Sequence, residues 1–479
     1  MRTTHLNVLA AVVVLSFPVF AHAQSSKAAL AADPQRVTVQ SGSCWVRYRG
    51  ETVLLVGDSI TQGWMELGTS FDQVAYLDAL AKRGINATLL WSYIGVTDQP
   101  HDPRIGYDSP EIWPWNRRGE KFDLASFNEE YFQRLRKFLD LAHERKIVVI
   151  LTVHDGWTKT RFAGHPFNAA KGGWLKNRSE YVRLGRPGTE MPKVFDETWS
   201  NAEKHQYALE RFCERLLTST GDAPNVMFEL FNEGEWYRRK EWEAFQRHFA
   251  TFFRTRSNQP VLVNDDQREG KAFRAEGNVD LLSFHMPQWE QQPPARTFFE
   301  LFARQRTAQP VKPVLFTEPV PEYQGGMERD DAILQLLWGT ALGGSGILFQ
   351  NDTSWGFDVR TTMAKHATDR DRVLDYEGLL CRFMNSGKLD IQKFTPAGSL
   401  VSSGVCIAKT GEEYLAFYDR LAPEATLDLR AAPGKNFTVT WYDPRTGKSR
   451  SEEKIAGGEN LVFQVPFPNE GVLHLKQAE

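Results

Sequence analysis

Two glutamates, each at the end of a short apolar run, are the residues of this chain best suited to chemistry. Glu233 closes the run at 226–233, and Glu318 closes the run at 313–318. An apolar run that stops at a carboxylate suggests a buried strand whose end opens onto a site. Two facing carboxyl groups can cleave a glycosidic bond, because one donates a proton while the other attacks or activates water. The sequence therefore predicts Glu233 and Glu318 as a catalytic pair.

The elements that would position this pair are eight strand-like runs that alternate with helical patterns. Continuous apolar runs favour parallel strands that are covered on both faces. Eight such strands interleaved with helices predict an α/β fold, a (β/α)₈ TIM barrel over residues 38–385. The runs lie at 53–56, 87–91, 147–153, 226–231, 261–263, 281–284, 314–316 and 346–349. Helices are expected near 129–145, 201–219, 238–256, 296–308, 329–342 and 370–385, while the interval 264–280 is poorly marked.

The pattern changes near residue 386. Short alternating runs follow, separated by turn signals such as Pro433-Gly434 and Gly457-Gly458. This pattern predicts a small antiparallel β-sandwich over residues 386–479. The runs are 414–418, 426–429, 437–442, 461–465 and 472–475.

Composition and the N-terminus restrict the class of protein. Hydrophobic content of 41%, charged content of 24% and a net charge of −3 are ordinary for a globular protein and give no reason to expect nucleic-acid binding. Arg2, an apolar stretch at 8–20 and Ala21-His22-Ala23 predict a signal peptide at 1–23 with cleavage after Ala23. We therefore expect a bacterial secreted or periplasmic protein, with no membrane span after cleavage.

The cysteines predict neither a metal site nor one disulfide pattern. Four are present, Cys44, Cys213, Cys381 and Cys406, and two bridges among them could connect in three ways. No CxxC pair occurs, which argues against structural zinc. No metal or cofactor is expected, since two carboxyl groups supply both the proton transfer and the nucleophile.

Further polar and aromatic residues fall near predicted strand ends, where a barrel of this type has its active site. They are expected to contact a carbohydrate substrate, and His285 could also hydrogen-bond the nucleophile. Glu229, four residues before Glu233, is instead expected to point into the barrel as a structural acid. The expected substrate contacts are Asn232, His154, His285, Trp355, Trp91, Asn351, Asp58 and Trp289.

Asn232-Glu233 after the fourth run and Glu318 after the seventh resemble the clan A retaining glycoside hydrolases, and the resemblance covers roughly residues 45–385. It implies that Glu233 is the general acid/base, that Asn232 holds the sugar 2-hydroxyl and that Glu318 is the nucleophile. Cellulase-type members usually show His-x-Tyr at strand six and an early Arg. Here 285–287 reads His-Met-Pro, and no early Arg is obvious.

Two other segments resemble a narrower group. Residues 53–58 and 76–86 are similar to the apiosidase-like bacterial barrels, and 439–447 resembles the collagen-binding-like domain that often follows those barrels. The similarity implies a secreted glycan-degrading enzyme. It also implies that the C-terminal sandwich buttresses the barrel or touches glycan.

A basic loop suggests a substrate class. Residues 159–186 contain seven basic residues and one acid, Glu180, in a chain that is acidic overall. Such a loop beside the active face would attract anionic sugars, for example in an acidic polysaccharide. Alternatively, its charges pair with acids elsewhere on the surface. The basic residues are Lys159, Arg161, Lys171, Lys176, Arg178, Arg183 and Arg186.

Three other functions compete with glycoside hydrolysis. Gly57-Asp58-Ser59 is similar to the first block of SGNH-type esterases, in which Ser59 would be the nucleophile, and Asp140-Leu141-Ala142-His143 could supply the other members. A barrel without catalysis could bind glycans. A metal-dependent hydrolase could use His154, Asp155 and His285, although no HExxH spacing occurs.

Overall fold

The computed structural model describes residues 33–60, 72–93, 112–156, 161–185, 198–234, 237–265, 270–285, 294–319, 330–350, 363–419 and 424–478. The predicted signal peptide lies outside these ranges. Within them, no helix is both long and apolar enough to cross a lipid bilayer.

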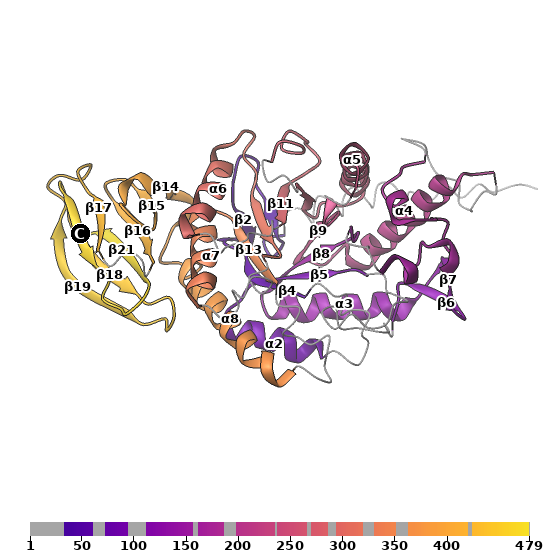
Figure 1. Ribbon diagram of the computed structural model, residues 1–479, viewed down its shortest axis with the longest axis horizontal. Helices are drawn as coiled ribbons and strands as arrows, with labels where there is room; N and C mark the ends of the chain where they lie inside the picture. The colour runs from indigo at the N-terminus through magenta and orange to yellow at the C-terminus, as the bar shows by residue number, and fades with distance from the viewer. Residues whose placement is uncertain are drawn as a thin grey trace, which may run out of the picture.

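Eight parallel strands close into a barrel, as the sequence predicted (Figure 1). Each strand pairs with the next along the chain, and the last pairs with the first. The first strand begins at Val56 rather than Val53, because Glu51–Val53 pairs in a separate hairpin. The barrel strands are β4 Val56–Ile60, β5 Ala87–Trp91, β8 Val148–Thr152, β9 Val226–Glu229, β10 Val261–Asn264, β11 Leu281–His285, β12 Val314–Thr317 and β13 Gly346–Gln350.

Helices surround the barrel. Asp72 caps the first of them by accepting hydrogen bonds from two backbone amides, and Gly84 ends it with φ of 80°. Between β10 and β11 the described residues form turns and no helix, at the interval where the sequence pattern is weak. The helices are α2 Gln73–Arg83, α3 Glu129–Glu144, α4 Asn201–Thr220, α5 Arg239–Arg256, α6 Ala295–Thr307, α7 Asp330–Gly343 and α8 Met363–Met384.

An N-terminal sheet closes one end of the barrel. It comprises β1 Thr38–Val39, β2 Val46–Tyr48 and β3 Glu51–Val53. Its buried Val46 and Tyr48 belong to the same apolar cluster as inward-facing residues near the starts of the barrel strands, such as Leu55 and Leu281. Since this sheet covers the N-terminal ends, a site can open only at the C-terminal ends of the strands.

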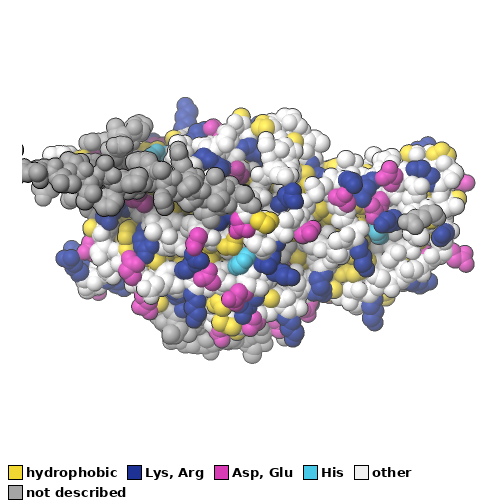
Figure 2. All heavy atoms as spheres, turned by 180° about the vertical axis from the view of Figure 1, so that it is seen from behind, with side chains coloured by type: hydrophobic (Ala, Val, Ile, Leu, Met, Phe, Trp, Pro, Cys, Tyr) yellow, Lys and Arg dark blue, Asp and Glu magenta, His cyan; other side chains and the backbone are white. Residues whose placement is uncertain are grey.

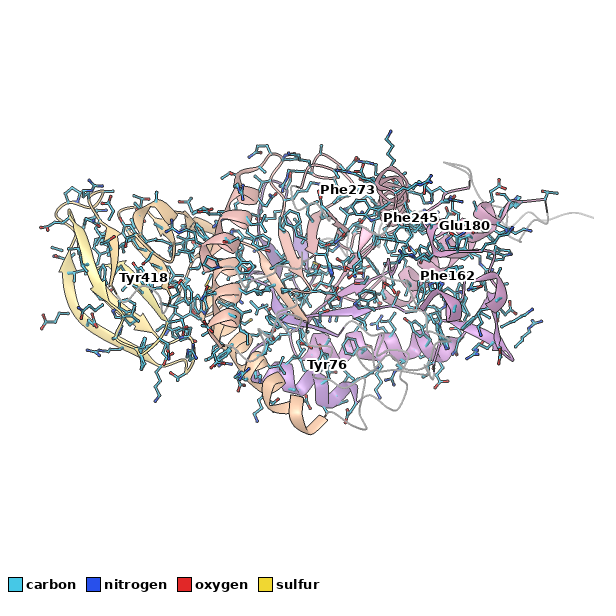
Figure 3. All side chains as sticks on the ribbon, in the orientation of Figure 1. Tyr76, Phe162, Glu180, Phe245, Phe273 and Tyr418 are labelled. Atoms are coloured by element: carbon cyan, nitrogen blue, oxygen red, sulfur yellow. The ribbon has the colours of Figure 1, made fainter. Side chains whose placement is uncertain are left out.

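An aromatic layer lies beside α4. It contains the hairpin of β6 Trp115–Arg118 and β7 Lys121–Phe127, and the short 3₁₀ helices η2 Arg161–Gly164, η3 Ala169–Lys171 and η4 Arg178–Glu180. Trp115 packs edge-on against Phe167 and lies beside Phe212 of α4. Figure 3 shows Phe162 and Glu180 of this region at the end of the molecule remote from Tyr418.

The C-terminal region is an antiparallel β-sandwich, as predicted. A six-stranded sheet in the order β14-β15-β16-β21-β18-β19 faces the pair β17-β20 across a separate apolar core that includes Tyr414 and Trp441. The strands are β14 Thr395–Pro396, β15 Val405–Lys409, β16 Glu413–Tyr418, β17 Glu424–Asp428, β18 Asn436–Tyr442, β19 Ser449–Ala456, β20 Asn460–Gln464 and β21 Gly471–Gln477, with 3₁₀ helices η8 Ile391–Lys393 and η9 Gly398–Leu400.

The sandwich packs on the barrel helices α6, α7 and α8 through an apolar interface (Figure 1). Phe417 stacks on Trp338 of α7 with an interplanar angle of 1° and ring centroids 5.9 Å apart. At the edge, Arg445 bridges Asp330 of α7 and the buried Glu470 at 2.8 and 2.6 Å. This continuous core makes the sandwich a support of the barrel wall.

The surface and the cysteines add no separate site. Basic and acidic side chains are interspersed over the face seen in Figure 2, which fits the mild net charge. The four cysteines are unpaired thiols, and Cys213, Cys381 and Cys406 are buried. None of the three disulfide arrangements considered from sequence is formed.

Candidate active site

Glu233, His285 and Glu318 meet at the C-terminal ends of three strands of the barrel. Glu233 follows β9, His285 ends β11 and Glu318 follows β12. Both glutamates have left-handed backbone, with φ of 53° and 54°. A non-glycine residue in this region costs roughly 1–3 kcal/mol, and such residues cluster at functional sites. Both acids therefore share an unfavourable backbone conformation, which directs their side chains into the barrel mouth.

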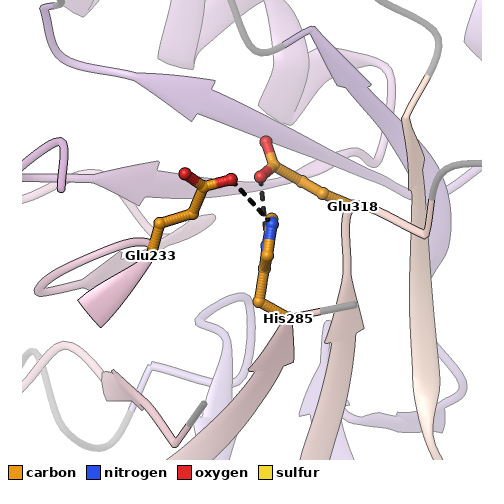
Figure 4. Close-up of side chains that lie close together, drawn as sticks. All are labelled: Glu233, His285 and Glu318. Atoms are coloured by element: carbon orange, nitrogen blue, oxygen red, sulfur yellow. Dashed lines mark ion pairs between the residues drawn. The ribbon is translucent and has the colours of Figure 1, made fainter. Parts of the chain in front are cut away.

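The His285 ring lies beside both carboxyl groups and contacts each of them (Figure 4). Its Nε2 is 3.0 Å from Glu233 Oε1, and its Nδ1 is 3.2 Å from Glu318 Oε2. One atom from each of the three side chains can be chosen so that all lie within 4.8 Å of one another. The two carboxyl groups therefore face each other, with one oxygen of each within 4.8 Å of one oxygen of the other.

Glu318 accepts hydrogen bonds at both carboxyl oxygens. Ser59 Oγ donates to Oε1 at 3.1 Å, and Trp91 Nε1 donates to the same oxygen at 3.2 Å. Asn232 Nδ2 donates to Oε2 at 3.3 Å. With Glu318 only 1% exposed, this protein shell fixes the direction of its carboxyl group.

The pKa of Glu318 is raised by burial to about 8. The nearby carboxylates of Glu233 and Glu229 raise it further, whereas His285 and the Ser59 hydrogen bond lower it. Trp91 Nε1 and Asn232 Nδ2 can only donate, so the ionised form is the one that satisfies both of them.

The loop after β8 packs closely against the segment that bears Glu233. The Gly156 amide donates to the Asn232 carbonyl at 2.9 Å, and the Asn232 amide donates to the His154 carbonyl at 3.1 Å. A Cβ at Gly156 would lie 2.1 Å from that Asn232 carbonyl oxygen. The chain therefore requires glycine at 156 to bring the two backbones this close, and this contact fixes Asn232 and Glu233.

Of the expected substrate contacts, Asn232, His285 and Trp91 are brought together with the acid pair. Trp91 contacts the carboxyl group of Glu318 itself. Glu229 lies inside the barrel, fully buried, and accepts a hydrogen bond from Thr152 Oγ1 at 2.7 Å, in agreement with the structural role expected of it.

The expectation for Asp58 is wrong. Its carboxylate is fully buried and accepts a hydrogen bond from Tyr76 of α2 at 2.9 Å, so it points outward to the helix layer. Strand β4 continues to Ile60, and neighbouring residues of a strand face opposite sides. Ser59 is therefore the inward-facing residue. Sequence reasoning missed it as part of this site, because strand alternation identifies it only once the limits of β4 are known.

The expectation for His154 is also wrong. Its ring is fully buried outside the barrel, with centroids 5.1 Å from Phe245 and 4.7 Å from Phe249. Its Nδ1 lies 3.1 Å from the Tyr181 hydroxyl. Burial lowers its pKa well below the usual value, so the ring is a neutral packing residue. It follows the end of β8, where strand alternation no longer predicts the direction of a side chain.

Three other expected contacts, Trp289, Asn351 and Trp355, lie outside the described residues.

The arrangement required for an esterase is not formed. Ser59 Oγ donates to Glu318 rather than to a histidine. His143 Nδ1 lies 2.8 Å from the hydroxyl of Tyr48, in the sheet that closes the opposite end of the barrel, and Asp140 pairs with Arg136. A serine nucleophile needs a histidine within hydrogen-bond reach, so Ser59 is a donor to a carboxylate here.

The grouping of Glu233, His285 and Glu318 is the set of His, Cys, Asp and Glu side chains that comes closest to a metal site among the described residues. However, the two ring nitrogens face different carboxylates. A single ion would need one nitrogen and both carboxylates directed at a common point. We therefore interpret the group as two acids bridged by an imidazole. The other metal arrangement considered from sequence is not formed, since His154 points away.

Two basic side chains of the loop at 159–186 lie near acids in the described structure. Lys171 lies 3.7 Å from Glu120, and Arg183 lies 3.8 Å from Glu180. Glu180 also accepts a hydrogen bond from the Lys176 amide at 2.8 Å. Lys159 and Arg186 lie outside the described residues. For these two cations, the contacts favour the alternative of surface pairing.

Comparisons with known proteins agree with this architecture. Residues 397–472 match a family described as "Putative collagen-binding domain of a collagenase". A solved structure described as a glycoside hydrolase has a TM-score of 0.64 at 13% identity, covering 93% of this chain and 97% of that chain. A glycoside hydrolase family 5 protein from Bacteroides vulgatus has a TM-score of 0.63 at 14% identity, covering 92% and 93%. No curated protein matches the chain in sequence.

These likenesses extend over barrel and sandwich together, and at such low identity they show a shared fold. The chain shares its fold, a (β/α)₈ barrel followed by a C-terminal β-sandwich, with that glycoside hydrolase family 5 protein.

Proposed function

We propose that the protein is a retaining glycoside hydrolase, with Glu233 as general acid/base and Glu318 as nucleophile. The observation that supports this most directly is the face-to-face pair of carboxyl groups at the barrel mouth, in which one oxygen of Glu233 and one of Glu318 lie within 4.8 Å of each other. This spacing suits direct attack on an anomeric carbon, because an inverting pair needs ~6.5–9.5 Å to admit water between the acid and the base.

In the proposed first step, a Glu318 oxygen bonds to the anomeric carbon while the glycosidic C–O bond breaks and the Glu233 proton moves to the leaving oxygen. In the second step, water attacks the same carbon and gives a proton to Glu233, and the bond to Glu318 breaks. The two steps restore both acids and retain the anomeric configuration.

The surroundings of the two acids support this division of roles. Glu318 is held by three side-chain donors, which stabilise a carboxylate and aim it. The Glu233 side chain is 17% exposed and lies closer to solvent, where a leaving group and water can reach it. His285 contacts both acids and could pass a proton between them or stabilise either anion.

The roles can be tested with Glu233→Gln and Glu318→Gln. A screen on plant, algal and bacterial polysaccharides first identifies the released sugar, and an aryl glycoside of that sugar with a good leaving group follows. Glu318→Gln should lose activity on both substrates, whereas Glu233→Gln should lose polysaccharide cleavage yet still form the glycosyl-enzyme from the aryl glycoside.

The exposed Glu300→Gln on α6 is the matched control and should behave as wild type. If both active-site variants match wild type on a hydrolysed substrate, the two-glutamate mechanism is wrong. If Glu318→Gln instead still reacts with the aryl glycoside while Glu233→Gln loses activity on both substrates, the two roles must be exchanged.

The retaining outcome has its own measurement. Proton NMR of the first product formed should show the anomer of the substrate bond. The opposite anomer would identify an inverting enzyme and remove the covalent step.

Substrate and location are further parts of the proposal. The similarity of residues 53–58 and 76–86 to apiosidase-like barrels suggests bacterial degradation of an apiose-containing glycan, and release of apiose would support it. Export rests on the N-terminal pattern at 1–23. Attraction of an acidic polysaccharide to the basic loop at 159–186 is also part of the proposal, although two of its cations, Lys171 and Arg183, already lie near acids.

A further inference from the structure

Oxygen Oε1 of Glu318 has two donors from neighbouring strands. Ser59 of β4 and Trp91 of β5 lie 3.1 and 3.2 Å from it. Both side chains face into the barrel, and Trp91 is 2% exposed. Strand pairing places these donors side by side, because Ser59 and Leu89 are partners in the β4–β5 ladder and Trp91 is two residues further along β5.

These donors are neutral. The charged groups that act most strongly on Glu318 are His285 of β11, Glu233 after β9 and Glu229 within β9. Two of these three are acids and oppose its ionisation, whereas His285 favours it. A buried carboxylate in such surroundings depends on hydrogen-bond donors to remain ionised.

We propose that Ser59 and Trp91 are positioning residues that hold Oε1 of Glu318, favour its ionised form and leave Oε2 as the attacking oxygen. Oε2 lies on the side of His285, 3.2 Å from its Nδ1, and accepts from Asn232 Nδ2. In the glycosyl-enzyme, Oε2 would be the ester oxygen and Oε1 the carbonyl oxygen. Oε1 would thus keep the same two donors through both steps. This assignment of oxygens rests on the proposed function, whereas the effect on ionisation does not.

Trp91 provides a direct probe, because its indole N–H donates to the carboxyl group in question. With ¹⁵N-tryptophan incorporated into the full chain, its resonance can be identified by its loss in Trp91→Phe. In the wild type we expect the chemical shift of that resonance to change with pH, with a midpoint at the pKa of Glu318. In Glu318→Gln the change with this midpoint should be absent. This measurement needs no substrate, so it is independent of the proposed activity.

Ser59→Ala should move the midpoint upward by about one pH unit, since a hydrogen bond to a charged group and one pKa unit are of comparable energy. Ser59→Thr keeps the hydroxyl and should restore most of the shift. The matched control is Ser92→Ala, which removes a fully buried hydroxyl at the end of β5 that donates to the Val153 carbonyl at 2.9 Å and not to Glu318.

Kinetics give a second measurement once a substrate is known. The acidic limb of the kcat/KM profile should move to higher pH in both Ser59→Ala and Trp91→Phe. In Ser59→Ala the shift should equal that of the NMR midpoint. In Trp91→Phe, which lacks the NMR probe, it should equal the shift in the midpoint of Glu318 labelling by carbodiimide. A lower kcat with an unmoved acidic limb would indicate a merely structural effect.

The ionisation proposal is overturned if the Trp91 resonance titrates equally in Glu318→Gln, or if Ser59→Ala and Ser92→Ala leave the same midpoint. If the midpoint shifts as expected while no glycoside is hydrolysed, the positioning role stands and the proposed function fails.

Discussion

Replacing Glu377 with glutamine should stabilise the protein at neutral pH and remove part of its pH dependence. Glu377 lies on α8 and is fully buried. Neither carboxyl oxygen has a hydrogen-bond partner in the part of the chain that the structure describes. Burial raises its pKa well above the usual value, the Asp58 carboxylate raises it further, and Arg83 lowers it.

The size of the effect follows from proton uptake on folding. An unfolded glutamate has a pKa of about 4.3, whereas the folded protein keeps Glu377 protonated to higher pH. The stability contributed by this group is therefore fully present below the unfolded pKa and is lost as pH rises toward the folded pKa. The loss is about 1.4 kcal/mol per pH unit, or about 3 kcal/mol between about pH 5 and pH 7.5 while the folded group stays protonated.

The assay is urea unfolding followed by tryptophan fluorescence at a series of pH values. Glu377→Gln should match wild type within about 1 kcal/mol near pH 5 and should gain on it by about 1.4 kcal/mol per pH unit above that, for as long as folded Glu377 stays protonated. Glu300→Gln on the exposed face of α6 should show no such divergence from wild type.

Parallel stability–pH curves for wild type and Glu377→Gln would refute the reasoning. They would mean that Glu377 has the same pKa in the folded and unfolded states, and hence that its carboxyl group is solvated or paired in the folded protein.

Three more changes test other parts of the structure. His285→Gln removes the imidazole that lowers the pKa of Glu318, so that pKa should rise and the acidic limb of kcat/KM should move to higher pH; an unmoved limb contradicts the contact. His154→Ala should cost about 2 kcal/mol or more of unfolding free energy without changing KM, and an altered KM would restore a substrate role. Phe417→Ala removes the ring stacked on Trp338 and should lower the free energy of unfolding by about 3–5 kcal/mol. An unchanged thermal unfolding midpoint of the full chain would show that the sandwich does not support the barrel.

Pattern in the sequence was sufficient for the architecture. A barrel strand covered on both faces must be apolar along its length, so each of the eight strands appears as a short run that interrupts helical periodicity. For the same reason the weakly marked interval between β10 and β11 contains turns rather than a helix in its described part. The position of Glu233 and Glu318 directly after such runs placed both at the C-terminal face, because parallel strands end together.

Side-chain direction near the strand ends was beyond that pattern, as Asp58 and His154 show. Whether a residue faces the barrel or the helices depends on where its strand begins and stops, and a shift of one residue reverses every side chain. The Ser59 and Trp91 bonds to Glu318 needed the pairing of two strands across the closed sheet. By itself the sequence determined the barrel, the sandwich and the acid pair, because burial restricts residue type locally. Only the tertiary structure decided which neighbours surround the acids, because those contacts join residues far apart in the chain.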